Sequence, residues 1–206
     1  MYDADAVELR VLGCLIEKQR TTPDQYPLSL NSLRLACNQT TNRDPIVTYD
    51  EHEIRAALDR LRAKGWTRLA SGAGSRAIKF RHLLDEALGL GDAELAVLSV
   101  LMLRGAQTPG ELKQRTERSH RFASLPEVQE TLEGLIARDL VERLQRRPGQ
   151  KEERYRHLLG AGGEAEPAPE AEPASNTVLQ SPGLAQRVAE LEERVARLEE
   201  QLSSAS

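Results

Sequence analysis

Apolar residues recur at helical spacing in two separate stretches of the chain. The two stripes keep spacings of three and four residues and consist of Leu9, Leu12 and Ile16, and of Leu95, Leu98 and Met102. Such spacing places apolar side chains on one buried face of a helix. The surrounding segments, ELRVLGCLI (8–16) and ELAVLSVLM (94–102), match at an offset of 86 residues, and a Thr-Pro pair follows each at equal distance. The chain therefore contains an internal repeat.

The repeat continues through another helix and a pair of strands in each copy. The later helical stripes are Ile54, Leu58 and Leu61, and Val128, Leu132 and Leu135. After them the pattern alternates with period two around a turn, 72–74 in one copy and 148–149 in the other, which predicts a β-hairpin. The hairpins end in FRHLL (80–84) and YRHLL (155–159), now at an offset of 75, so the first copy carries eleven extra residues.

Local signals mark the ends of the helices. Residues 29–37 and the capping box that starts at Thr108 predict the second helix of each copy, and capping boxes at Thr48 and Ser124 predict the starts of the third helices. Gly65 suits the end of a helix. Three helices and a hairpin per copy predict a mainly α (α+β) protein of two tandem winged-helix domains, residues 1–88 and 89–160.

The composition changes after the second copy. Residues 161–180 are rich in Gly, Ala, Pro and Glu, and they predict a flexible linker. Residues 181–203 carry a heptad pattern, which predicts a coiled-coil helix and a parallel homodimer whose seam is Val188, Leu191, Val195, Leu198 and Leu202. The alternative is an amphipathic helix folded back on its own chain.

One segment carries a resemblance to a known family. The run YPLSLNSLRLACNQTTNRDPI, residues 26–46, resembles the YceH-like family of uncharacterised bacterial proteins, and the similarity extends over residues 5–160. The resemblance implies a tandem winged-helix fold and brings no activity or site residue with it.

Charge is distributed unevenly along the chain. Residues 1–85 hold 13 basic and 11 acidic residues, residues 86–160 hold 12 of each, and residues 161–206 hold 3 and 9, so the net charge of −4 belongs to the C-terminal part. No apolar run is long enough to span a membrane, and the acidic start MYDADAVELR lacks the basic head of a secretory signal. We therefore expect a cytoplasmic protein without membrane contact.

Basic residues gather where a winged helix contacts DNA, which is on the third helix and the hairpin. The candidate DNA-binding residues are Arg55, Arg60, Arg62 and Lys64 on the third helix of the first copy, Arg76, Lys79 and Arg81 on its hairpin, and Arg146, Arg147 and Lys151 on the second hairpin. The third helix of the second copy carries Glu127, Glu130 and Glu133 instead, a poor match to phosphates.

The loop CNQTTNRDP, residues 37–45, has two interpretations. Its Asn, Thr and Asp side chains suit a turn that ends one helix and leads to the next. Alternatively, Asn38, Gln39, Asn42 and Arg43 present amide and guanidinium donors to a partner or to DNA. The sequence leaves both open.

No catalytic or metal-binding pattern stands out. Cys14 aligns with Val100, which indicates packing, and the four histidines are scattered without ligand spacing. We expect no catalytic residue, metal or cofactor. The sequence predicts a non-enzymatic regulator that binds double-stranded DNA, and the alternative is a protein–protein interaction module of a chromosome-associated or other complex.

Overall fold

The computed structural model describes residues 2–70, 78–146 and 152–160. The predicted linker and coiled-coil helix lie outside these ranges, with the whole dimer seam, and so do the two hairpin turns with Arg76, Arg147 and Lys151. No helix within the described ranges is both long and apolar enough to cross a membrane.

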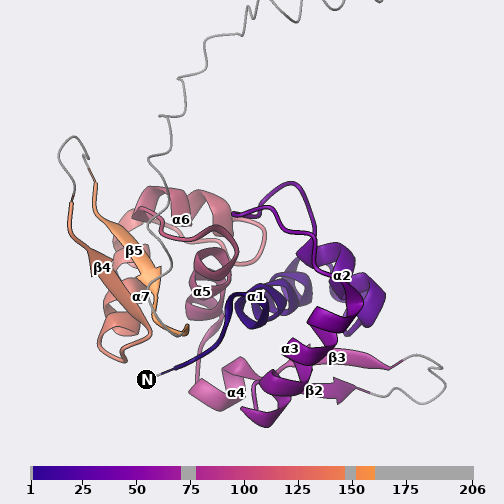
Figure 1. Ribbon diagram of the computed structural model, residues 1–206. Helices are drawn as coiled ribbons and strands as arrows, with labels where there is room; N and C mark the ends of the chain where they lie inside the picture. The colour runs from indigo at the N-terminus through magenta and orange to yellow at the C-terminus, as the bar shows by residue number, and fades with distance from the viewer. Residues whose placement is uncertain (1, 71–77, 147–151, 161–206) are drawn as a thin grey trace, which may run out of the picture. The chain divides into compact units, whose positions relative to one another are not determined.

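Helices dominate the described chain, and an order of three helices followed by two paired strands occurs twice (Figure 1). The first repeat consists of α1 (Ala6–Thr21), a 3-10 turn η1 (Pro23–Gln25), β1 (Leu28–Ser29), α2 (Leu30–Cys37), α3 (Glu51–Ala63), β2 (Thr67–Ala70), β3 (Lys79–His82) and α4 (Leu84–Leu88). The second repeat consists of α5 (Asp92–Arg104), α6 (Pro109–Thr116), α7 (Leu125–Ile136), β4 (Val141–Leu144) and β5 (Arg154–His157). The predicted mainly helical α+β class is confirmed.

The strands after each third helix form two small antiparallel sheets, and the first sheet also includes β1 from earlier in the chain. In the first, β3 lies between β1 and β2, with Leu28 opposite Phe80. In the second, β4 pairs with β5, and Gln107 makes an isolated bridge to Tyr155, the counterpart of Phe80. The sequence analysis predicted the hairpins but neither β1 nor α4.

The start of α3 differs from its predicted position. Its N-cap is Asp50, which forms a capping box with Glu53, rather than Thr48 with Glu51. The reason is that the Asn38 side chain accepts from the backbone N–H of Tyr49 at 2.9 Å and donates to its carbonyl at 2.8 Å. These bonds hold residue 49 outside the helix. The capping box of Thr108 with Glu111 is confirmed, and Ser124 caps α7.

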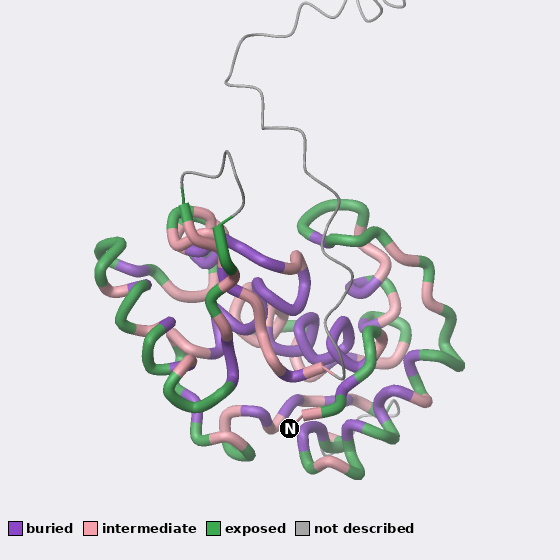
Figure 2. The backbone as a smooth tube through the Cα atoms, turned by 60° about the vertical axis from the view of Figure 1, so that its left-hand side comes forward, coloured by how far each residue is buried: buried purple, intermediate pink, exposed green. Residues whose placement is uncertain are grey.

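The core centres on α1 and α5, which pack against each other between the two repeats (Figures 1 and 2). Ser99 donates from its hydroxyl to the carbonyl of Gly13 at 3.2 Å, and these two residues are equivalent at the repeat offset of 86. A Cβ on Gly13 would lie 2.9 Å from Leu103 Cγ. The first helices of the two repeats therefore approach closely at a position that has room only for glycine.

Candidate nucleic-acid interface

The basic residues of α3 lie on two different flanks of the helix. Ile54, Leu58 and Leu61 face the core. Because a helix turns once in 3.6 residues, Arg55 and Arg62 share one flank, and Arg60 and Lys64 share the opposite one. The four residues predicted as one DNA-binding group therefore form two separate pairs.

Arg60 and Lys64 bind the N-terminal segment, residues 2–5, and the start of α1. Arg60 Nη2 lies 2.6 Å from Asp5 Oδ2, and Lys64 Nζ lies 2.8 Å from Asp3 Oδ1 and 3.3 Å from Oε1 of the buried Glu8. The Lys64 ammonium holds the pKa of Asp3 below its ordinary value through a hydrogen bond and its charge. The two positive charges of Arg60 and Lys64 are thus paired with carboxylates of the same chain.

The same N-terminal segment reaches the second repeat. The Ala4 amide donates to the Leu159 carbonyl at 3.0 Å, and Ala4 forms a parallel bridge with Gly160. Arg60 and Lys64 consequently fix the segment that contacts the end of the second repeat, which is a structural role.

Arg55 and Arg62 lie on the solvent flank of α3. Arg55 is exposed, and the Arg62 side chain is 54% exposed with Asp59 at 3.1 Å as a partner one turn away. An exposed pair of this kind contributes little to stability. This flank is therefore available to a ligand.

The first hairpin adds basic residues on its outer face. Phe80 and His82 of β3 are buried, so Lys79 and Arg81 point to the other side of the sheet. Arg68 of β2 lies directly opposite Arg81 and shares that side. The sequence analysis did not select Arg68, because its position opposite Arg81 depends on the strand register.

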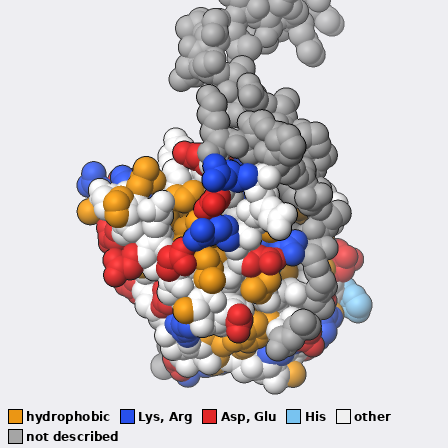
Figure 3. Space-filling model, turned by 90° about the vertical axis from the view of Figure 1, so that its left-hand side faces the viewer, with side chains coloured by type: hydrophobic (Ala, Val, Ile, Leu, Met, Phe, Trp, Pro, Cys, Tyr) orange, Lys and Arg blue, Asp and Glu red, His pale blue; other side chains and the backbone are white. Residues whose placement is uncertain are grey.

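Among the described residues, the second hairpin offers fewer free basic side chains than the first. Among the predicted residues, the structure describes only Arg146, which is exposed. Arg156 pairs with Glu142, Arg143 with Glu133 and Glu153, and Arg154 with Glu111. Figure 3 faces this side of the molecule and shows basic and acidic side chains interspersed.

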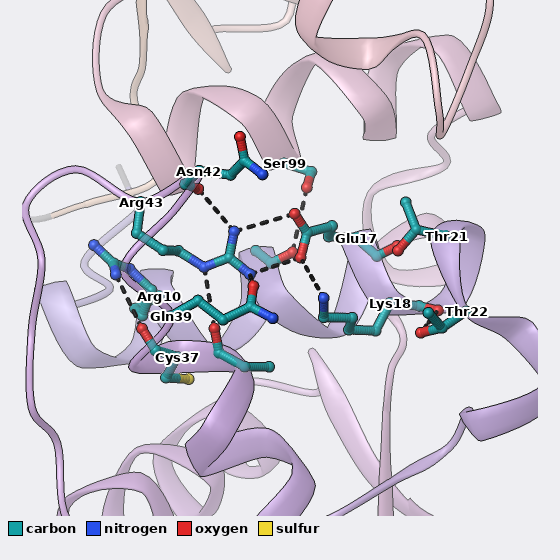
Figure 4. A network of polar contacts seen from close by, with 12 residues as sticks. Arg10, Glu17, Lys18, Thr21, Thr22, Cys37, Gln39, Asn42, Arg43 and Ser99 are labelled. Atoms are coloured by element: carbon teal, nitrogen blue, oxygen red, sulfur yellow. Dashed lines mark hydrogen bonds and ion pairs between the residues drawn. The ribbon is translucent and has the colours of Figure 1, made fainter. Parts of the chain in front are cut away.

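The 37–45 loop is built around Arg43, whose side chain is fully buried (Figure 4). Its guanidinium donates to both carboxylate oxygens of Glu17, at 2.6 and 3.1 Å, to Gln39 Oε1 at 2.8 Å and to the Ala36 carbonyl at 3.1 Å. Burial alone would raise the pKa of Glu17, but the hydrogen bonds and charge of Arg43 outweigh it and lower that pKa. Glu17 is a partner that the sequence analysis missed.

The loop also connects the two repeats. The Asp44 amide donates to the Leu103 carbonyl at 2.8 Å, and Asn42, at a left-handed φ of 60°, accepts from Arg104. With Asn38 bound to Tyr49, all four predicted loop residues make internal hydrogen bonds. The geometry favours the first interpretation, that of a structural turn.

The two cysteines and His82 are buried, and His157 is half-buried. Cys14 and Cys37 are buried and unbridged. His82 and His157 occupy the same position of the repeat, and burial lowers the pKa of each to about 4, so both are neutral at pH 7. Within the ranges that the structure describes, no group of three or more His, Cys, Asp or Glu side chains could hold a metal ion.

Comparison with known proteins gives one family. Residues 4–150 match the family described as "Protein of unknown function, DUF480". A UPF0502 protein of Opitutus terrae is 53% identical over 178 residues, which cover 84% of this chain and 77% of the relative. A UPF0502 protein of Serratia proteamaculans is 46% identical and covers 98% of this chain and 95% of the relative, and one of Geobacter metallireducens is 48% identical with 92% and 87% covered.

Proposed function

The chain belongs to the DUF480 family, whose description names no activity, and we propose its function from the geometry. We propose that its two repeats are tandem winged-helix units and that the first of them binds double-stranded DNA. Each repeat places three helices before an antiparallel hairpin, which is the order of a winged helix. In that fold the third helix enters the major groove. We propose binding without catalysis, in the cytoplasm.

The solvent flank of α3 carries this proposal. Arg55 and Arg62 are seven residues apart, and so they lie on one side of the helix about 10 Å from each other. Arg55 is in the N-terminal half, where recognition helices contact base edges, and Arg62 is placed for the phosphate backbone. The acidic residues near this flank, Glu51 and Asp59, are themselves exposed.

We expect the double variant Arg55→Gln with Arg62→Gln to weaken binding of a labelled duplex by at least about tenfold. The salt dependence of binding should also fall, by about one counterion for each phosphate contact that is lost. Fluorescence anisotropy at several salt concentrations measures both. Arg60→Gln is the control, because it removes one positive charge from the opposite flank of the same helix. A folded wild-type protein that binds no duplex at low salt would refute DNA binding, and an equal loss in Arg60→Gln would refute the choice of flank.

The second repeat supports a second candidate, a protein-interaction module. Its third helix, α7, has Glu130 and Glu133 on the exposed face with Glu127 beside them, and Leu125 at its start is 46% exposed. Carboxylates repel phosphates, whereas a protein partner tolerates such a mixed face. Crosslinking in the native cell, followed by identification of the enriched DNA or protein, separates the two candidates.

We also propose a homodimer through the heptad segment. Val188 and Val195 at one core position with Leu191 and Leu198 at the other favour a parallel two-stranded coil. Sedimentation should give a dimer for the full chain and a monomer for a chain that ends at Gly160. Two monomers would exclude the coiled-coil dimer, and two dimers would place the interface in the repeats.

A further inference from the structure

The outer face of the first hairpin brings like charges together. Arg68 lies directly opposite Arg81 across β2 and β3, and Lys79 is on the same side two residues along β3. Like charges directly opposite in an antiparallel pair are destabilising. We infer that this face is a binding site for a polyanion, formed by Arg68, Lys79 and Arg81, and that it contacts the phosphate backbone of the DNA.

Few acidic side chains are near enough to neutralise this face. Within the described ranges, Glu86 lies 3.1 Å from Arg81, and neither Arg68 nor Lys79 has a carboxylate within 4 Å. The sequence of the intervening turn, residues 71–77, contains Arg76 and no acidic residue. The face therefore keeps most of its positive charge, which a row of phosphates would offset.

The second hairpin is an internal comparison, because its strands pair in the same register as those of the first. Arg156 corresponds to Arg81 and Arg154 to Lys79, so both basic residues of the strand recur. Glu142, however, takes the place of Arg68: it lies opposite Arg156 and pairs with it. Arg154 is held by Glu111 at 3.1 Å. The same fold position is thus neutralised in one repeat and left charged in the other.

The test is the variant Arg68→Glu, which gives the first hairpin the charge pattern of the second. Without added anion, its thermal midpoint should rise by about 1 to 4 °C, because an opposite-charge pair replaces a like-charge pair. Inorganic tripolyphosphate should raise the midpoint of the wild type, since a ligand that binds only the folded state stabilises it, and should have no such effect on the variant. Duplex affinity should fall by at least about tenfold.

Two further variants serve as controls for this test. Glu142→Gln removes a charge from the second hairpin and should retain duplex affinity and the tripolyphosphate effect. Arg68→Gln removes the charge without adding an acid, and it decides the question if Arg68→Glu fails to fold.

The inference rests on the proposed function, but the experiment can refute the hairpin site and DNA binding independently of each other. If the wild type and both Arg68 variants bind duplex equally well, the hairpin site is wrong and DNA binding stands. If tripolyphosphate stabilises the protein through Arg68 while no duplex is bound, the anion site stands and the proposed function is wrong. If tripolyphosphate stabilises wild type and variant alike, the site assignment is overturned.

Discussion

Replacing Arg43 with methionine is expected to lower the free energy of unfolding by about 3 kcal/mol. The substitution removes both hydrogen bonds from Arg43 to the Glu17 carboxylate and leaves that charge with Lys18, at 3.3 Å, as its remaining cation. Losing one partner of a buried ion pair costs about 3–5 kcal/mol, and we expect the lower end because the Glu17 side chain keeps 20% exposure. Urea unfolding followed by the fluorescence of Trp66, the single tryptophan, measures the change.

The variant that combines Arg43→Met with Glu17→Gln is the control for this prediction. Glutamine keeps the shape of glutamate without the charge, so the double variant should be more stable than Arg43→Met alone. An Arg43→Met protein within about 1 kcal/mol of wild type would show that the loop does not depend on the ion pair.

Replacing Gly13 with alanine is expected to destabilise the protein by about 1–3 kcal/mol through overpacking. The new Cβ would lie 2.9 Å from Leu103 Cγ and 3.3 Å from Met102 Cβ, so α1 and α5 must move apart. The loss should outweigh the gain of about 1 kcal/mol that alanine normally brings to a helix interior. Thermal and urea unfolding measure the balance.

Gly134 provides the matched control, since it also lies within a helix but has open space around its Cβ position. Gly134→Ala should stabilise the protein by up to about 1 kcal/mol. If Gly13→Ala behaves like Gly134→Ala, the close approach of α1 and α5 does not limit stability.

The sequence predicted those elements whose signals are local. Apolar spacing located the helices, and the FRHLL and YRHLL segments located the final strands. β1 was missed because two residues carry no periodicity, and the start of α3 was misplaced because Asn38, eleven positions before Tyr49, decides it.

The candidate site was less predictable, since it depends on contacts between distant segments. Arg60 and Arg62 are both arginines of one helix, and contacts with Asp5 and Glu8, more than 50 positions away, show that Arg60 is used within the protein. Arg43 is neutralised by a residue 26 positions earlier. Arg68 becomes a candidate only when the strand register places it opposite Arg81, and the sequence pattern does not fix that register.

The bridge between Ala4 and Gly160 has a consequence for cooperativity. Because Ala4, close to the first described residue, pairs with Gly160, the last one, fraying of either end releases the other. A Cβ on Gly160 would lie 3.2 Å from the Ala4 carbonyl oxygen, so a larger residue there would crowd this contact. We therefore expect the Ala4 amide to exchange its hydrogen more slowly than the amide of a free chain end, because exchange requires the first repeat to release the end of the second.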